Sequence, residues 1–498
     1  MHNLKMKKYL SALSVLLLAL GSCSYDKQVD PLVGSGYPKE VGEIIVNKCA
    51  TAGCHNSLSR ANAGGLDFST WDLMFEGGRN GSSVIPYNID YSYLLYFINT
   101  DSLRGPTLLP TMPQGLSPLS NEEYQTIYNW IHNGAPNDQG AIKFADDPNR
   151  KKFYVCMQGC DQVAVFDAQT KVIMRYVSVG VDPAIEAPHL VRVSPDGQYW
   201  YVVFYSGHVI QKFRTSDDSY MGSLEIGNGD WNTVIFTPDS KKGFVSATTL
   251  GITRVVDLEH MTLETSLSID FPHGGFVTDD GEYLYLTSQN GNFVTKIEIS
   301  DPFYDTDKIP LGTGENPSTS SKYDAHEMIL SPDGHKYFVS CQKSNEVRVF
   351  ERDRSHDEDS LIAIIPVGNK PQEFSLSETH PYVFVTCTED SLMGYRKKGS
   401  VYVINYLTNQ VVKVIYTGYQ PHGIAVDDDH NCVYVANLNY DNNGPAPHHV
   451  TACGGRNGYL TVIDMSTLEL YRKVLSDGST FEYRNELLSF PYFVSYRK

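Results

Sequence analysis

The chain of 498 residues is long enough for more than one domain, and its hydrophobic share of 41% allows a large core. Its 33 Tyr, 21 Phe and 40 Gly are typical of strands and turns rather than helices. The formal net charge is −18 and the isoelectric point lies near 5.2. This acidity argues against nucleic acid or anionic lipid as a binding partner.

Residues 1–22 are expected to form a secretion signal. Three lysines, Lys5, Lys7 and Lys8, precede an apolar run, 10–20, that is too short to span a bilayer. The end of the signal, Leu20-Gly21-Ser22-Cys23, resembles the cleavage box of bacterial lipoproteins. The resemblance implies that Cys23 is lipidated and anchors the exported chain to a bacterial membrane, on the periplasmic or surface side of the outer membrane. An ordinary cleaved signal is the alternative, and 23–37 are expected to form a tether.

A pattern that can attach haem follows a predicted helix opened by Pro38. It reads Cys49-Ala50-Thr51-Ala52-Gly53-Cys54-His55. Two cysteines followed at once by histidine can bond to the vinyl groups of a porphyrin, and the histidine then becomes an axial iron ligand. The usual gap between the cysteines is two residues, and here it is four. A disulfide between Cys49 and Cys54 is the alternative.

A methionine and a closing helix follow this pattern. Prolines on both sides of Met112, at 110 and 113, predict an extended segment. A thioether held in such a segment suits the sixth position of haem iron, with an ordinary core methionine as the alternative. Ser120 and Glu123 form a capping-box pattern for a helix that stops at Gly134-Ala135-Pro136, and a shorter helix is expected within 91–99.

These features together resemble a class I cytochrome c domain. The resemblance covers roughly 38–137 and gives expected domain bounds of 38–140. It implies a small all-α domain that binds one covalent haem c through Cys49 and Cys54, with His55 and Met112 as axial ligands of the iron.

The remainder, 141–498, is expected to be mainly β. Turns such as Ser194-Pro195-Asp196-Gly197 recur about every 40 to 50 residues, a period that fits four strands. We therefore predict a seven-bladed β-propeller, with 486–496 as the candidate closing strand. Strand endings such as Tyr434-Val435-Ala436-Asn437 resemble the Tyr-Val-Thr-Asn (YVTN) repeat propellers of secreted and surface proteins, a resemblance that concerns the fold alone.

One position recurs five residues before each turn, at the predicted start of the innermost strand of each blade. It is occupied in chain order by Ile142, His189, Asn232, His273, His326, Gln372 and His422. These side chains are expected to ring one mouth of the central channel. Neutral imidazoles there could hold a metal ion or a second cofactor. The alternative is a structural role, in which the histidines satisfy backbone groups and water.

The remaining cysteines fall into two groups. Cys453 lies with His448 and His449 in an insertion of the seventh blade, a set that could bind copper or zinc. A disulfide with Cys160 in the first blade is the alternative, because a ring makes these two blades neighbours. Cys341 and Cys387 occupy equivalent places in adjacent blades and are expected to be small buried residues.

The function that we expect is that of a haem-binding electron-transfer lipoprotein, whose propeller docks a redox partner protein or a substrate. We predict no catalytic residues, and an electron carrier is favoured over a stand-alone enzyme. The order of the domains resembles haem-d1 nitrite reductases, and a histidine-lined propeller mouth resembles nitrous oxide reductases. These two resemblances imply an alternative function, that of a periplasmic oxidoreductase. In that case a second metal ion or cofactor would be bound at the propeller mouth by His189, His273, His326 and His422. A surface binding scaffold is the other alternative.

Overall fold

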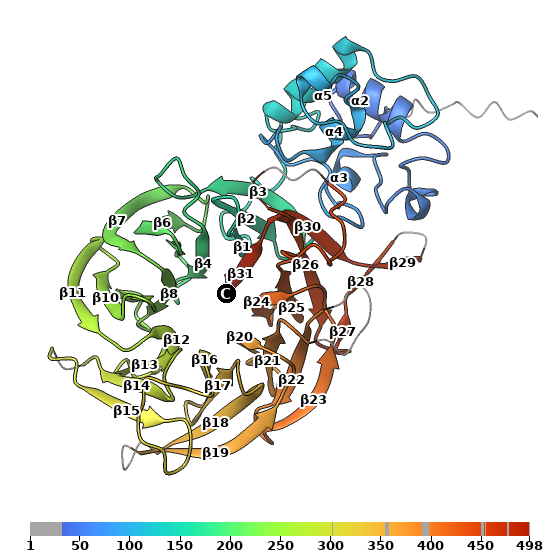
Figure 1. Ribbon diagram of the computed structural model, residues 1–498. Coiled ribbons are helices and arrows are strands. Elements are labelled where there is room, and N and C mark those ends of the chain that lie inside the picture. Colours follow the sequence, from blue (N-terminus) through green and yellow to red (C-terminus); the bar gives the residue numbers. More distant parts are fainter. Residues whose placement is uncertain are drawn as a thin grey trace, which may run out of the picture.

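The computed structural model describes residues 32–300, 302–353, 358–390, 398–449, 453, 455–475 and 478–497. A β-propeller makes up the larger part, and a smaller helical region stands beside it (Figure 1). The predicted lipidation site Cys23 and the signal sequence lie outside the described residues. No helix within the described ranges has the length and apolar character that crossing a bilayer would need.

Seven sheets stand around a common centre, and each forms one blade of the propeller (Figure 1). Blades two to six each place their first strand innermost, so that first strands of neighbouring blades contact one another. The predicted seven-bladed, mainly β propeller is therefore confirmed.

The strands of blades two to four follow in chain order. Blade two consists of β4 (Pro188–Val193), β5 (Tyr199–Phe204), β6 (Gly207–Arg214) and β7 (Tyr220–Gly229). Blade three consists of β8 (Trp231–Phe236), β9 (Lys242–Ala247), β10 (Ile252–Asp257) and β11 (Thr262–Ser268). Blade four consists of β12 (Pro272–Val277), β13 (Tyr283–Ser288), β14 (Phe293–Glu298) and β15 (Thr306–Pro310).

Blades five to seven continue the same plan. Blade five consists of β16 (Ala325–Leu330), β17 (Lys336–Cys341), β18 (Glu346–Asp353) and β19 (Glu358–Pro366). Blade six consists of β20 (Pro371–Leu376), β21 (Tyr382–Cys387), β22 (Ser400–Asn405) and β23 (Gln410–Ile415). Blade seven has β24 (Pro421–Asp427), β25 (Cys432–Asn437) and β26 (Asn457–Asp464), and both β27 (Glu469–Leu470) and β30 (Arg484–Ser489) pair with the outer edge of β26. A hairpin of β28 (Arg472–Val474) and β29 (Thr480–Glu482) stands between them.

The first blade combines the two ends of the propeller chain. Its outer strands are β1 (Lys152–Met157), β2 (Gln162–Asp167) and β3 (Ile173–Ser178), and its innermost strand is β31 (Pro491–Tyr496). The register pairs Phe153 with Tyr496 and Val155 with Val494. The C-terminal segment therefore closes the ring, as the candidate closing strand predicted.

The blades pack through large apolar side chains on both faces. Phe153 of blade one stacks on Tyr434 of blade seven, with ring centroids 3.8 Å apart, and Tyr154 of blade one contacts Trp200 of blade two at 5.4 Å. Because each blade is covered on both faces by its neighbours, the second strand of every blade is buried along nearly its whole length.

The region before the propeller is helical. It contains α2 (Lys39–Ile44), continued by a π-helical turn (Ile45–Cys49), then α3 (Trp71–Met74), α4 (Tyr93–Ile98) and α5 (Asn121–His132), with 3₁₀ turns at Arg60–Asn62 and Ser102–Arg104. The predicted capping box is present, since the Ser120 side chain accepts from the backbone N–H of Glu123. The helices stand where the sequence predicted them. They are few and short, however, so the assignment to a cytochrome c domain remains a prediction.

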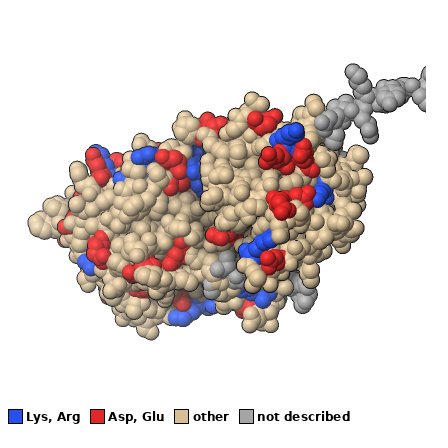
Figure 2. All heavy atoms as spheres, turned by 90° about the horizontal axis from the view of Figure 1, so that it is seen from above, with Lys and Arg blue, Asp and Glu red and all other residues tan. Residues whose placement is uncertain are grey.

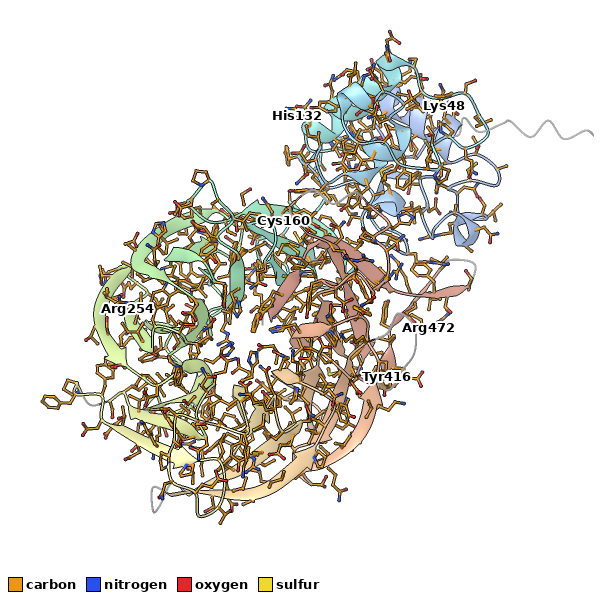
Figure 3. All side chains as sticks on the ribbon, in the orientation of Figure 1. Lys48, His132, Cys160, Arg254, Tyr416 and Arg472 are labelled. Carbon is orange, nitrogen blue, oxygen red and sulfur yellow. A yellow bond between two sulfur atoms is a disulfide. The ribbon has the colours of Figure 1, made fainter. Side chains whose placement is uncertain are left out.

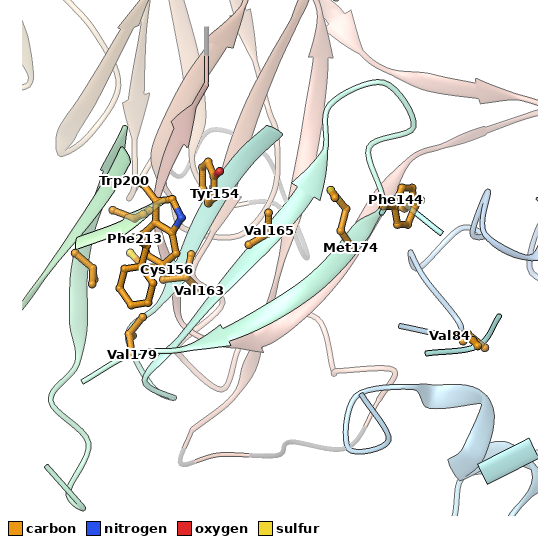
Figure 4. Packing of buried hydrophobic residues seen from close by; sticks show 14 of the residues in the cluster. Val84, Phe144, Tyr154, Cys156, Val163, Val165, Met174, Val179, Trp200 and Phe213 are labelled. Atoms are coloured by element: carbon orange, nitrogen blue, oxygen red, sulfur yellow. The ribbon is translucent and has the colours of Figure 1, made fainter. Parts of the chain in front are cut away.

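One hydrophobic cluster joins the helical region to the first two blades. Figure 4 shows Phe144 beside Met174, with Val165 and Val163 on the same sheet, Trp200 beyond them, and Val84 of the helical region on the far side of Phe144. The two parts of the molecule therefore share a core. On the outside, Figure 2 shows acidic and basic side chains interspersed over the face in view, without a broad patch of one sign.

Candidate functional site

The cysteine-histidine stretch forms a compact turn at the end of the π-helical segment. The backbone N–H of His55 donates to the carbonyl oxygen of Cys49 at 3.0 Å, and that of Cys54 donates to Thr51 at the same distance. Cys49 is buried, Cys54 is half-buried, and both are free thiols. The alternative prediction, a disulfide between Cys49 and Cys54, is therefore wrong.

The His55 side chain is largely enclosed. Its ring packs against Phe68 with centroids 4.9 Å apart, and its Nδ1 is buried without a hydrogen-bond partner among the described residues. Burial lowers the pKa of His55, and a hydrogen bond with the backbone of Ala63 opposes this only partly. The imidazole is therefore neutral near pH 7, which is the form that binds a metal ion.

Met112 lies at a bend in the loop between α4 and α5, not in the extended segment that was predicted. Its backbone N–H donates to the carbonyl oxygen of Phe97 at 2.8 Å, and its side chain packs against the same hydrophobic cluster that contains Cys49. Two free thiols, a neutral imidazole with an unpaired buried nitrogen and a thioether are the donors that a c-type haem requires. In donor type, these four residues fit that group.

A second group of residues gathers where the innermost strands of the blades begin. In all seven blades the register between the innermost strand and its neighbour shifts at this point. Such β-bulges redirect side chains. The residues here are His189, Asn232, His273, His326, Gln372, His422 and Tyr492.

The prediction that Ile142 belongs to this set is wrong. Residue 142 precedes β1 and lies in no strand, and Tyr492 takes the corresponding place in the first blade. The reason is that β31 from the C-terminus supplies the innermost strand of that blade. The dipeptide Pro491-Tyr492 repeats the Pro-His pattern of blades two, four and seven, with tyrosine in place of histidine.

The four predicted histidines and Tyr492 form a closed circle of ring contacts. The ring centroids are 6.4 Å apart for His189 and His273, 4.1 Å for His273 and His326, and 5.8 Å for His326 and His422. Tyr492 completes the circle at 3.9 Å from His422 and 4.4 Å from His189. Nitrogen-bearing side chains accordingly surround the centre of the propeller in Figure 3.

The four imidazoles differ in their hydrogen bonds. The Nδ1 atoms of three of them have partners: His189 with the Gln158 amide at 3.0 Å, His273 with the carbonyl oxygen of His326 at 3.1 Å, and His422 with the carbonyl oxygen of Tyr492 at 3.2 Å. Both ring nitrogens of His326 and the Nε2 of His422 lack a hydrogen-bond partner within the part of the chain that the structure describes. Burial lowers the pKa of all four, to about 3 for His326.

Two glutamates complete the group, and sequence reasoning missed both. Glu327 and Glu373 directly follow the ring positions of blades five and six and are buried. The Oε1 of Glu373 lies 3.3 Å from Nε2 of His326 and 4.0 Å from Nδ1 of His422. Burial raises the pKa of both carboxyls, that of Glu327 further through the charge of Glu373, and Arg192 opposes this in each.

The sequence could have indicated these glutamates through the position that directly follows each of the seven residues where the innermost strands begin. The seven residues there are Leu190, Thr233, Gly274, Glu327, Glu373, Gly423 and Phe493. Ionisable side chains in an otherwise apolar or small set indicate a functional position.

Hydroxyl groups hold the backbone of this circle in place. Thr287, Ser340 and Thr386 each accept a backbone N–H of their own blade and donate to the ring residue's carbonyl oxygen in the next blade, at 2.9, 2.7 and 2.8 Å. Cys156 has the equivalent role in blade one, with its Sγ 3.4 Å from the carbonyl oxygen of His189. The circle is therefore anchored independently of any ligand.

A cavity of about 340 Å³ adjoins the circle. Both His422 and Tyr492 line it, together with side chains of several blades: Gln158, Lys370, Gln372, Thr388, Glu389, Leu438, Tyr440 and Phe490. A small molecule or water can therefore reach the His422 side of the circle.

The proposed copper or zinc set around Cys453 is not formed, and the disulfide alternative is confirmed. Cys453 is bonded to Cys160, which lies at the edge of blade one beside the helical region (Figure 3). His449 stacks on Tyr93 with ring centroids 3.6 Å apart. Cys341 and Cys387 are buried free thiols, as predicted.

Comparison with known proteins supports the propeller fold but assigns the chain to no family. No protein-family model matches the chain. Antigen Lp49 of Leptospira interrogans is 22% identical over 255 residues, which are 49% of this chain and 53% of that protein, so the chain spans about half the length of this curated relative.

Two solved structures with similar folds come from Pseudomonas aeruginosa and Bacteroides uniformis. The periplasmic gluconolactonase PpgL of P. aeruginosa has a TM-score of 0.52 and 13% identity and covers 70% of this chain and 99% of its own. A protein of B. uniformis provisionally described as a 6-phosphogluconolactonase has a TM-score of 0.53 and 12% identity, with the same coverage. Likeness at this level shows the propeller fold alone.

Proposed function

We propose that the protein is an exported electron carrier that holds one covalent haem c in its helical region, and that its propeller docks a redox partner protein or a substrate. The observation that carries the proposal is the donor set at the Cys49–His55 turn. Two free thiols lie next to a neutral imidazole with an unpaired buried nitrogen, and Met112 packs into the same core as Cys49.

The residues have distinct roles in this proposal. Cys49 and Cys54 would hold the haem through thioether bonds, and His55 and Met112 would bind its iron. The bound group supplies one-electron redox chemistry. Burial raises the pKa of Cys49 to about 12, so its thiol stays protonated before attachment. Methionine as a ligand raises the reduction potential relative to two histidines.

We also propose that the chain is exported and lipid-anchored through Cys23. The lysine-rich start, the short apolar run and the box that ends at Cys23 support this. The disulfide between Cys160 and Cys453 supports an oxidising compartment, because such bonds rarely persist in a reducing cytosol. The formal net charge of −18 suits a basic redox partner protein.

A pyridine haemochrome spectrum of the full chain, produced with haem-attachment machinery, tests the proposal. We expect one haem per chain joined by two thioether bonds, and none in the Cys49→Ser/Cys54→Ser variant. Met112→Leu should keep the covalent haem, lose the methionine-to-iron absorption band and lower the potential. Met465→Leu, a buried methionine of the propeller, is the matched control and should change none of these. Wild-type protein without covalent haem would contradict the proposal.

Two other functions make different predictions. A binding scaffold would keep its partner and its biological role in the Cys49→Ser/Cys54→Ser variant, whereas an electron carrier would lose the role. An oxidoreductase with a second metal in the propeller is favoured by one observation, the buried cluster of His326, Glu373 and His422.

A further inference from the structure

We propose that the centre of the propeller binds a divalent transition-metal ion through His326, Glu373 and His422. These three residues come from three successive blades, and one ligand atom of each lies within 4.8 Å of the other two. All three side chains are buried. The site is separate from the residues proposed to hold haem, and the inference does not depend on them.

The nitrogen atoms of the two histidines are available to a metal ion. Both nitrogens of His326 and the Nε2 of His422 have no hydrogen-bond partner among the residues described, although each is buried. A buried polar atom without a partner costs about 1–3 kcal/mol, so such atoms usually indicate an absent water or ion. Nε2 of His326 lies 3.3 Å from Oε1 of Glu373, and His422 approaches the same oxygen through Nδ1, at 4.0 Å.

A hydrogen bond of Nδ1 fixes the orientation of the His422 ring. Its Nδ1 lies 3.2 Å from the carbonyl oxygen of Tyr492, to which it can donate, and this leaves Nε2 as the acceptor. Metal-binding histidines characteristically donate their other N–H to a carbonyl or carboxylate, which fixes the tautomer and the ring orientation. The backbone carbonyl of His422 is itself held by Thr386 at 2.8 Å.

The protein compensates the two buried carboxyls only in part, although a side-chain hydrogen bond joins Glu327 and Glu373. Glu327 accepts the backbone N–H of Met328 at 2.8 Å and lies against the backbone of Gly274, where a Cβ would come within 2.2 Å of its Oε1. Arg192 acts on both glutamates electrostatically, but its own Nη1 donates to the carbonyl oxygen of Val234. Buried carboxylates of this kind are usually paired or bind metal.

The ligand set identifies the class of metal. Two imidazoles with one carboxylate suit Zn²⁺ or Fe²⁺, whereas Ca²⁺ and Mg²⁺ prefer oxygen ligands throughout. Three protein ligands leave at least one coordination position open. The adjoining cavity of about 340 Å³ gives a small molecule access from the His422 side.

Two of the four histidines that the sequence predicted as ligands are not needed to bind the metal ion. Only His326 and His422 of the four belong, with Glu373, to the group whose ligand atoms lie within 4.8 Å of one another. The rings of His189 and His273 enclose the site but are not needed as ligands.

A surface cluster provides a matched control. Asp182, Glu186 and His208 also have ligand atoms within 4.8 Å of one another. Asp182 is exposed, however, and Nδ1 of His208 already contacts the Glu225 carboxylate at 2.6 Å. Removal of His208 should therefore not affect the metal that the buried site binds.

The experiment uses full-length protein stripped with a chelator and equilibrated with Zn²⁺. Bound zinc is counted by mass spectrometry, affinity is measured by calorimetry, and the ligands are identified by zinc X-ray absorption. We expect one tightly bound zinc with nitrogen and oxygen neighbours and the scattering of two imidazoles. Glu373→Gln should weaken binding at least tenfold, and His326→Gln should weaken it further. His208→Gln and Cys49→Ser/Cys54→Ser should bind zinc as the wild type does.

Three results would overturn the proposal. The first is that the wild-type protein binds no zinc, and the second is that His208→Gln loses zinc binding. The third is that the double cysteine variant loses zinc binding, which would place the zinc on the thiols. Circular dichroism checks the fold of each variant. Should Glu373→Gln be unfolded, His422→Gln replaces it, and unchanged affinity in the folded variant counts against the site.

Discussion

At the scale of single residues, His449 shows how a buried imidazole joins the helical region to the propeller. Its ring stacks on Tyr93, and its Nδ1 lies 3.7 Å from the Glu486 carboxylate. That carboxylate already accepts the backbone N–H groups of His448 and His449, at 2.7 and 2.8 Å. Burial lowers the pKa of His449 to about 3, and nearby His448 adds to the shift. Desolvation therefore outweighs the carboxylate.

This burial predicts sensitivity to acid. The unfolded chain takes up a proton at His449 below pH of about 6.5, whereas the folded chain does so only near 3, so stability falls as the pH drops through this window. His449→Phe keeps the stack on Tyr93 and removes the titration. We expect its free energy of unfolding to fall less between pH 7 and 4 than that of the wild type, measured by urea unfolding.

A matched control separates titration from packing. Tyr93→Phe keeps the same pair of rings and removes only a buried hydroxyl that has no partner in the described part of the chain. Its pH dependence should equal that of the wild type. An acid response of His449→Phe identical to the control would count against the interpretation.

Residue-level prediction succeeded where a residue's role depends on its neighbours in sequence. The capping pair Ser120 and Glu123 is local and was found. The role of Glu373 depends on a β-bulge and on histidines from two other blades, and the spacing of one recurring position does not reveal it. Glu327 was missed for the same reason.

At the scale of elements, the propeller ring is closed by two devices. One is the pairing of β31 with β1, and the other is the Cys160–Cys453 disulfide between the first and seventh blades. The blades themselves could be predicted because each is a run of antiparallel strands joined by short turns. The closing strand was expected within 486–496, but its place as the innermost strand of blade one was not, because it lies at the far end of the chain. That non-local pairing is the reason why Ile142 was placed wrongly.

The disulfide should stabilise the ring without being required for it. It joins residues 293 apart in sequence, and removal of a native disulfide costs about 2–5 kcal/mol. We expect Cys160→Ser/Cys453→Ser to fold, because β31 still closes the sheet, but to unfold at lower urea concentration. A reductant should lower the midpoint of the wild type to that of the variant and leave the variant unchanged. Equal midpoints for oxidised wild type and variant would show that β31 alone secures the closure.

At the scale of the whole molecule, the helical region and the propeller form a continuous structure. Lys473 donates to the carbonyl oxygen of Glu76, and the Glu486 backbone N–H donates to that of Asn80 at 3.2 Å. Phe97, whose carbonyl oxygen holds the backbone of Met112, contacts the rings of His448 and His449. The proposed haem-ligand segment therefore packs against blade seven, which also carries His422 of the proposed metal site.

Gly81 makes the cooperativity of this assembly testable. It has φ of +100° at the boundary with β30, and a Cβ there would lie 1.9 Å from Oδ1 of Asn485. Asn485 is fully buried and donates to Lys171 and Tyr483 of the propeller, at 2.9 and 2.8 Å. Gly81→Ala must therefore displace a buried amide and loosen the boundary. We expect calorimetry to show two separate unfolding transitions in place of one, with faster proteolysis between the two parts.

The strain of a left-handed backbone must be distinguished from this clash. Gly105 has φ of +128°, and a Cβ added there would meet no atom of the described residues within 4 Å. Gly105→Ala therefore measures the backbone cost alone, about 1–3 kcal/mol. It should lower the melting temperature and keep a single transition. If Gly81→Ala behaves like Gly105→Ala, the shared core seen in Figure 4 holds the two parts together without the Asn485 contact, and the boundary at β30 contributes little to their coupling.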